Sequence, residues 1–328
     1  MNSIKNLFWN NEEARLRAGW RIVVFWVAWF ILLFAVLGLT NALFSGRLNE
    51  AYLAPVTTAI HLLIVWMVLL GFVGSLLLDR RHVTDYGFHL SRVWWLDLGF
   101  GLTLATLLML GIFVIELVTG WIKVSGSFVT ADPSLSFGPA ILAGFIGLLL
   151  GVIQEEVTWR GYTIKNIAEG MNWKAIGPRV ATIIAMLVSS VMFGLAHAGN
   201  LNATIFSTIN SILAALLVLA TGYALTGELA LPIGFHAAWN FTQVCVFGFP
   251  GGKPILGATF IAIQQSGPEV WTGGVYGPEG GSLGTGAFIL GSLLMLAWVL
   301  VKRGSIRLHP SPAEPPALLR RKMKSEQI

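Results

Sequence analysis

The sequence predicts an all-α, polytopic membrane protein with about eight transmembrane helices and a polar site buried between them. Three observations support this fold class. Of 328 residues, 55% are hydrophobic and only 11% are charged, whereas a soluble domain carries about 25% charged residues. Apolar runs recur along most of the chain, and about 20 residues suffice to cross a hydrocarbon core about 30 Å thick. Polar groups of specific kinds interrupt these runs. Soluble globular, disordered and coiled-coil folds are therefore excluded.

The expected transmembrane spans are residues 22–44, 54–78, 96–118, 138–160, 181–197, 203–226, 231–249 and 287–301. They divide the chain into three parts. The first run is too long for a cleavable signal peptide and no small-residue cleavage site follows it. We expect residues 1–21 to form a cytoplasmic segment, 22–301 a transmembrane domain, and 302–328 a basic, disordered tail. A Gly-rich stretch, 250–284, is expected to form a long outer loop.

The distribution of basic residues predicts the orientation. An even number of spans places both termini on one side, and cytoplasmic loops are enriched in Lys and Arg. If the N-terminus is cytoplasmic, only Arg47, Lys123 and Lys253 lie on the outer side, which leaves 18 of the 21 basic residues inside. We therefore expect a multi-pass protein of the plasma (inner) membrane with both termini in the cytoplasm.

Cysteine content and net charge exclude further classes. The single cysteine, Cys245, rules out an intrachain disulfide and a cysteine metal cluster. The formal charge of +5 favours contact with anionic lipid over nucleic acid, because basic loops attract the cytoplasmic leaflet of a membrane.

The first polar cluster lies in the run GVIQEEVTWRGY. Glu155 and Glu156 are adjacent, and Arg160 follows Glu156 by four residues, so that pair shares one helix face. A charge within a span costs at least about 2.5 to 3.5 kcal/mol, which suggests that the cluster has partners or a task. Glu156 can be held charged by Arg160 while Glu155 faces an interior cavity as a general base. The alternative is a helix end at the interface, where these charges are simply solvated.

Two further clusters contain histidine. His197 ends the sequence FGLAH, and His236 and Asn240 lie four residues apart in HAAWN, on one side of their helix. Their alternative role is hydrogen bonding between packed helices. Glu116 and His61 are further ionisable residues within expected spans.

Three polar clusters on three helices avoid lipid most easily if they face one another. Carboxylate, imidazole and amide groups together can activate a water molecule and stabilise the oxyanion that forms when it attacks a carbonyl. Glu155 and His197 lie at similar depths in the membrane only if the fourth helix continues past Arg160 to about Glu169. Glu155 and His197 then lie within about 10 Å of each other in height.

These residues resemble the CPBP (CAAX protease and bacteriocin-processing, or Abi) family of intramembrane proteases, which includes type II CAAX prenyl endopeptidases. The family pattern is EExxxR, FxxxH and HxxxN or HxxxD on successive helices. This chain has EEVTWR at 155–160, FGLAH at 193–197 and HAAWN at 236–240. The resemblance spans about residues 145–245, with a weaker similarity in RR and YGF at 80–88.

The resemblance implies an eight-helix protease whose site opens from the cytoplasmic half of the membrane. By the same resemblance, Glu155 and His197 activate water, His236 and Asn240 stabilise the oxyanion, and Glu156 with Arg160 orders the first pair. We expect no cofactor, although Glu155, His197 and His236 could together bind zinc with one open position. The HExxH spacing of soluble zinc proteases is absent.

The expected activity is hydrolysis of a peptide bond in a membrane protein or lipidated peptide within the bilayer, with no nucleic-acid partner. One alternative is a transporter whose buried charges line a solute path. Another is a non-catalytic membrane partner or immunity protein. The sequence does not identify the substrate.

Overall fold

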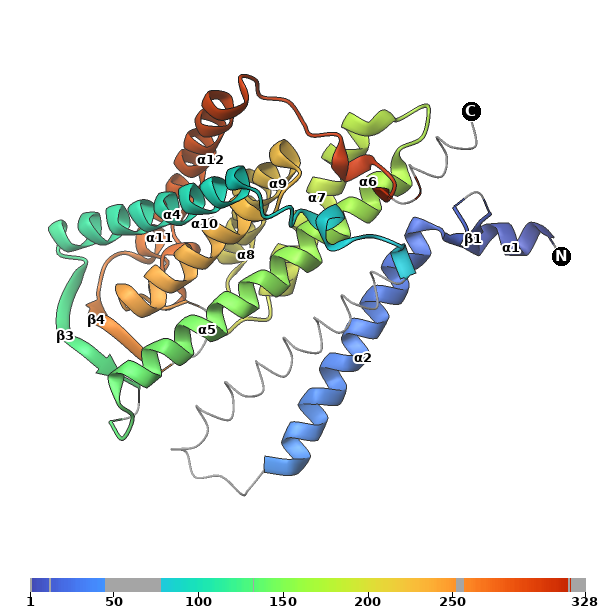
Figure 1. Cartoon of the computed structure of the whole chain (residues 1–328). Coiled ribbons are helices and arrows are strands. Elements are labelled where there is room, and N and C mark those ends of the chain that lie inside the picture. Colours follow the sequence, from blue (N-terminus) through green and yellow to red (C-terminus); the bar gives the residue numbers. More distant parts are fainter. Residues whose placement is uncertain are drawn as a thin grey trace.

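The computed structural model describes residues 2–11, 13–44, 78–131, 133–251, 257–317 and 319, and they are mostly helical (Figure 1). The α-helices are α1 (Asn2–Phe8), α2 (Ala18–Phe44), α4 (Arg92–Val118), α5 (Phe137–Glu156), α6 (Lys165–Met171), α7 (Gly177–His197), α8 (Ile205–Ala214), α9 (Thr221–Thr226), α10 (Ala230–Phe241), α11 (Glu269–Thr272) and α12 (Ser282–Arg303). Three π-helical segments are η2 (Val157–Ile164), η3 (Ala215–Ala220) and η4 (Thr242–Val246). The 3-10 helices are η1 (Val83–Tyr86), η5 (Gly274–Tyr276), η6 (Pro278–Gly280) and η7 (Ser311–Ala313).

Within the described ranges, five helices are long and apolar enough to cross a membrane. They are Arg92–Val118, Phe137–Met171, Gly177–His197, Ile205–Thr226 and Ser282–Arg303. The helical membrane-protein class is thus confirmed, but the count of eight is not. Of the other three expected spans, 22–44 falls within α2, 54–78 lies almost entirely outside the described residues, and 231–249 corresponds to the shorter pair α10 and η4.

The fourth expected helix continues beyond Arg160, as the depth argument requires. α5, η2 and α6 form one uninterrupted helical span, Phe137–Met171. The π-helical turn begins at Val157, directly after the two glutamates, and every residue of η2 is buried. Wider π-helical turns occur often at functional sites because they displace side chains from the regular helical positions. Here the π-helical turn contains Arg160.

A β-hairpin-like ribbon was not predicted from the sequence. β3 (Ile122–Thr130) pairs antiparallel with β4 (Ala258–Gln265), with Ile122 opposite Gln265 and Thr130 opposite Ala258. The expected loop 250–284 is therefore largely structured, since it also contains α11, η5 and η6. β1 (Trp9–Asn10) and β2 (Arg15–Leu16) form a second, very short antiparallel pair.

A very close helix crossing in the core joins α4 and α10. A Cβ atom built on Gly234 would lie 2.3 Å from the carbonyl oxygen of Leu98, and one on Gly101 would lie 2.7 Å from that of Leu231. Small residues of this kind let helix backbones approach closely in membranes. This crossing holds α10, which contains His236, in the centre of the main hydrophobic core.

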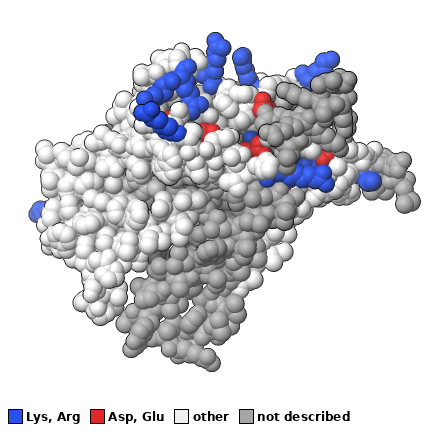
Figure 2. All heavy atoms as spheres, viewed as in Figure 1, with Lys and Arg blue, Asp and Glu red and all other residues white. Residues whose placement is uncertain are grey.

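The bundle has two chemically different ends. The "basic end" contains α6, the starts of α4, α7 and α10, and the ends of α9 and α12, where Arg303 pairs with Asp97. The "hairpin end" contains β3, β4 and η6, the starts of α5, α8 and α12, and the end of α7. On the face shown in Figure 2, Lys and Arg gather along one edge and most of the remaining described surface is uncharged. The helices therefore alternate in direction between a charged end and a largely uncharged one.

A cluster of ion pairs joins the N-terminal segment to the basic end. The Glu169 carboxylate on α6 accepts hydrogen bonds from Arg15, Arg21 and Arg81. All three arginines are at most 3% exposed. Burial, followed by the charge of Arg21, lowers the pKa of Arg15, and burial lowers the pKa of Arg81 to about 10.

Part of the C-terminal segment also packs on the basic end. The Lys165 ammonium donates to the Ser311 carbonyl oxygen at 2.6 Å, and the Asn172 amide donates to that of Ala313 at 3.0 Å. The His309 N–H donates to the Ala224 carbonyl oxygen at 2.7 Å. Residues 304–317 thus differ from the disorder expected for 302–328, because backbone groups of this segment find polar partners on α6 and α9. Residues 318 and 320–328 lie outside the described part.

Candidate active site

Glu155 and Glu156 are the last two residues of α5, where the helix widens into η2. A guanidinium nitrogen of Arg160, Nη1, donates to Glu156 Oε1 at 3.1 Å, and both side chains are essentially inaccessible. The Glu155 side chain is 20% exposed. The predicted Glu156–Arg160 pair is therefore present, and the two neighbouring carboxylates occupy different environments.

His236 on α10 connects the two glutamates. Its Nδ1 lies 2.7 Å from Glu156 Oε1, and its Nε2 lies 3.7 Å from Glu155 Oε2. Because a carboxylate accepts hydrogen bonds, Glu156 fixes Nδ1 as a donor and orients the ring. Nε2 is consequently the imidazole nitrogen that faces Glu155.

Phe193 on α7 joins the remaining motif residues to this group. The Arg160 guanidinium lies 4.4 Å from the centre of the Phe193 ring, a cation–π arrangement. The ring centre is 4.2 Å from that of His197 and 6.1 Å from that of His236. His197 Nδ1 lies 2.8 Å from the Phe193 carbonyl oxygen, so Nδ1 is the donor and Nε2 is directed away from its own helix backbone.

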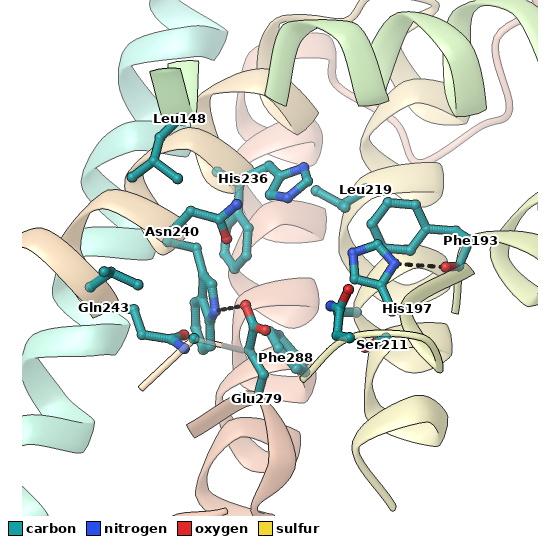
Figure 3. Close-up of a pocket in the computed structure, with 16 residues that line it drawn as sticks. Leu148, Phe193, His197, Ser211, Leu219, His236, Asn240, Gln243, Glu279 and Phe288 are labelled. Carbon is teal, nitrogen blue, oxygen red and sulfur yellow. Dashed lines mark hydrogen bonds between the residues drawn. The ribbon is translucent and has the colours of Figure 1, made fainter. Parts of the chain in front are cut away.

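A cavity separates α7 from α10, and its lining includes His197, His236 and Asn240 of the predicted side chains, whereas Glu155, Glu156 and Arg160 are not among its lining residues. His197 lies on one side, and His236 and Asn240 lie on the other (Figure 3). The cavity volume is about 60 Å³, whereas one water molecule needs roughly 10 to 15 Å³. The structure therefore brings the HxxxN and FxxxH motifs to one space with room for several water molecules, and His236 links that space to Glu155, Glu156 and Arg160.

The sequence analysis missed a wall of this cavity that comes from η6. Glu279 lines the cavity, and its Oε1 accepts a hydrogen bond from Trp239 Nε1 at 3.0 Å (Figure 3). The Asn210 amide on α8 donates to the backbone oxygens of Glu279 and Gly281, each at 3.0 Å. In the sequence, only the clustered glycines of 250–284 indicated a specific backbone structure. No local sequence pattern connected them with the three motifs.

Glu116, a further buried carboxylate within an expected span, lies on α4 and is not among the residues that line the cavity. His61 falls outside the part of the chain that the structure describes.

The possible zinc ligands do not form a metal-binding arrangement. Among the described residues, no group of three or more His, Cys, Asp or Glu side chains is placed to hold a metal ion. Of the three possible zinc ligands Glu155, His197 and His236, His236 instead forms a hydrogen bond with Glu156 through Nδ1. We therefore derive no catalytic step through zinc, and a metalloprotease assignment is not supported.

Comparison with known proteins agrees with the motif pattern. Residues 137–242 match the family model "Type II CAAX prenyl endopeptidase Rce1-like". No curated protein and no solved structure matches the chain. The matched residues include all three motifs, from Glu155 to Asn240. The resemblance to the CPBP family is therefore confirmed over residues 137–242, about a third of the chain.

Proposed function

We propose that this protein is an intramembrane endopeptidase that hydrolyses a peptide bond of a membrane-associated or lipidated substrate. The observation that carries the proposal is the contact of His236 with both glutamates, beside a cavity that also contains His197 and Asn240. The match to an endopeptidase family at 137–242 supports the reaction class.

The charges of the group suit this chemistry. With His236 protonated, the two carboxylates of Glu155 and Glu156 are balanced by His236 and Arg160. A balanced, hydrogen-bonded group avoids the large cost of leaving one charge unpaired in a buried site. In this state His236 donates through Nδ1 to Glu156, and its Nε2–H is available to the cavity.

In the proposed reaction, a water molecule between Glu155 and His197 attacks the substrate carbonyl carbon. Glu155 accepts the proton of that water as the new C–O bond forms, and His197 orients it. The carbonyl oxygen becomes an oxyanion, stabilised by His236 Nε2–H and the Asn240 amide. The C–N bond then breaks, and the proton held by Glu155 is transferred to the leaving amine.

We also propose a location and a division of the chain. The basic end faces the cytoplasm, in accordance with the positive-inside rule, so both termini are cytoplasmic in the plasma membrane. Residues 22–301 form the catalytic transmembrane domain, and the bilayer and a membrane protein or lipidated peptide are its partners.

Comparing new protein N-termini in membranes tests this function without knowledge of the substrate. Cells that express the wild-type chain are compared with cells that express Glu155→Gln, by mass spectrometry of labelled N-termini. We expect a set of internal N-termini that disappears in Glu155→Gln. The matched control is Glu116→Gln, which neutralises a buried carboxylate outside the cavity and should retain the set. Identical N-termini in wild type and Glu155→Gln would contradict the proposal.

A further inference from the structure

The segment that contains η5 and η6 contributes an acidic side chain to the cavity from outside the matched residues 137–242. Glu279 is partly exposed, and its carboxylate points into the space between His197 and Asn240 (Figure 3). Of the described residues that line the cavity, Glu279 is the only one with a carboxylate. The imidazole and amide groups of the proposed reaction therefore share their cavity with one further acidic group.

Buried polar side chains and close backbone packing hold this segment in place. The Asn210 amide, whose residue is 1% exposed, donates to the Glu279 carbonyl oxygen at 3.0 Å. The Thr285 hydroxyl in turn donates to Asn210 Oδ1 at 2.7 Å. Gly277 has a φ of +86°, which favours glycine, and a Cβ atom there would lie 2.1 Å from the Pro250 carbonyl oxygen. The backbone position of Glu279 is thus fixed by the fold.

The Glu279 side chain is oriented by the helix that carries the HxxxN motif. Trp239 lies between His236 and Asn240 in HAAWN and is 2% exposed. Its Nε1 donates to Glu279 Oε1 at 3.0 Å, and its ring centre lies 4.6 Å from that of Phe288. The carboxylate is therefore held in the same cavity as the residues that we propose stabilise the oxyanion.

The surroundings of Glu279 favour a cation in this cavity. Apolar side chains form much of the lining, and opposite charges attract more strongly where the dielectric constant is low. Pockets of this kind take their specificity from a few well-placed polar groups. The oxyanion of the proposed reaction adds a second negative charge near His236 and Asn240. A positive charge on the bound molecule offsets both negative charges.

We propose that the cavity is a subsite for a cationic side chain and that Glu279 recognises it. The substrate class is then a membrane-associated polypeptide with Lys or Arg next to the cleaved bond. The identification of the cation as part of a substrate rests on the proposed function, but the binding of a cation beside Glu279 does not.

The residues that flank the cleaved bonds test this specificity. New protein N-termini are compared in membranes from cells that express wild type, Glu279→Gln, Glu279→Asp or Glu269→Gln. Glu279→Gln removes the charge but keeps an oxygen that can accept from Trp239. The matched control is Glu269→Gln, because Glu269 belongs to the same segment, is exposed and does not line the cavity.

We expect Lys and Arg to be enriched next to the bonds whose cleavage depends on Glu155. This enrichment should be lost in Glu279→Gln, retained in Glu269→Gln and partly retained in Glu279→Asp, which keeps the charge. Cleavage sites without such enrichment in wild type would overturn the proposal, and so would an enrichment that is unchanged in Glu279→Gln.

A binding measurement on the wild-type chain tests the cation site independently of proteolysis and of any variant. The protein is purified in detergent and treated with dicyclohexylcarbodiimide, which modifies carboxyl groups in apolar surroundings. The modification of Glu279 is then measured by mass spectrometry of its peptide. We expect n-butylammonium to protect Glu279, whereas n-butanol at the same concentration should not.

Equal protection by the two compounds, or protection by neither, would overturn the cation site. Failure of Glu279 to react at all would also overturn it, because the carboxylate would then be closed to small molecules. If no N-termini depend on Glu155, the protease function fails, while the protection result still decides whether the cavity binds a cation.

Discussion

At the scale of single residues, Glu156 makes two contacts in the candidate site, whereas the sequence predicts only its pairing with Arg160. One carboxylate oxygen, Oε1, accepts from both Arg160 and His236, and the residue is fully buried. Glu156 therefore orients the imidazole that faces Glu155. This makes Glu156 a positioning residue, whereas Glu155 lies beside His236 Nε2, the nitrogen that we propose contacts the oxyanion.

Replacing Glu156 by Gln should destabilise the protein. The change leaves the buried Arg160 guanidinium without its closest counter-charge, and breaking a buried ion pair costs about 3 to 5 kcal/mol. We expect a clear fall in Tm, measured by thermal unfolding of purified protein in detergent. The double variant Glu156→Gln/Arg160→Met should recover part of the loss because neither charge remains. A Tm equal to that of wild type in Glu156→Gln would contradict the importance of this pair.

Metal removal should leave proteolysis unchanged. The proposed reaction uses Glu155 as base and contains no metal-dependent step. The measurement is the cleavage rate of protein dialysed against a chelator, with metal content determined by mass spectrometry. Loss of activity that returns on adding Zn²⁺ would show that the proposed scheme is wrong.

The sequence predicts the motif residues well because each motif is local. The spacing of Glu156 and Arg160 by one helical turn predicts their contact, and the structure contains it. The double contact of His236 depends on how α10 packs against α5, and the contribution of Glu279 depends on a segment outside the matched domain. Neither follows from local spacing.

At the scale of elements, the α4–α10 crossing should be sensitive to one added methyl group. Gly234→Ala would place Cβ 2.3 Å from the Leu98 carbonyl oxygen, and overpacking of this kind costs about 1 to 3 kcal/mol. We expect a lower Tm and reduced proteolysis because α10 must shift. Gly99→Ala is the matched control on α4, where nothing lies within 4 Å of the added Cβ. Equal Tm values for the two variants would refute the close crossing.

The C-terminal segment should loosen at acidic pH. Burial, followed by the charge of Arg303, holds the pKa of His309 below its ordinary value of 6.5. The packed segment therefore favours neutral His309, so its packing is most stable above about pH 6.5 and weakens as the pH falls and the released form takes up a proton. Lys165 opposes protonation as well, while Glu314 favours it.

A spin label on Ser305→Cys, in the Cys245→Ala background, reports the mobility of this segment. We expect higher mobility at pH 5.5 than at pH 7.5, and little pH dependence once His309→Gln is added. A pH response that is unchanged in His309→Gln would assign the effect to another group.

Helices were more predictable than strands for a physical reason. A long apolar run fixes a membrane helix locally, because its backbone hydrogen bonds close within the segment. β3 and β4 pair although four of the expected spans lie between them in the sequence. Most residues of β3 are also exposed. Their pairing is a tertiary event, so the expectation of an all-α chain with a long loop at 250–284 missed it.

At the scale of the whole molecule, the two ends of the bundle differ in charge. The sequence predicts the charge asymmetry by counting Lys and Arg, and Figure 2 shows these residues gathered along one edge of the face it presents. The position of the cavity could not be predicted in the same way, because it depends on segments such as η6 that fold back onto the helix ends.

The most direct test of the central claim is hydrolysis by the purified full chain, reconstituted in bilayers and supplied with a substrate identified from its N-termini. In H₂¹⁸O, we expect wild-type protein to cleave the substrate and to place ¹⁸O in the new carboxyl group. Glu155→Gln, with an unchanged Tm, should form no product. Equal amounts of labelled product from wild type and Glu155→Gln would contradict a site in which Glu155 activates water.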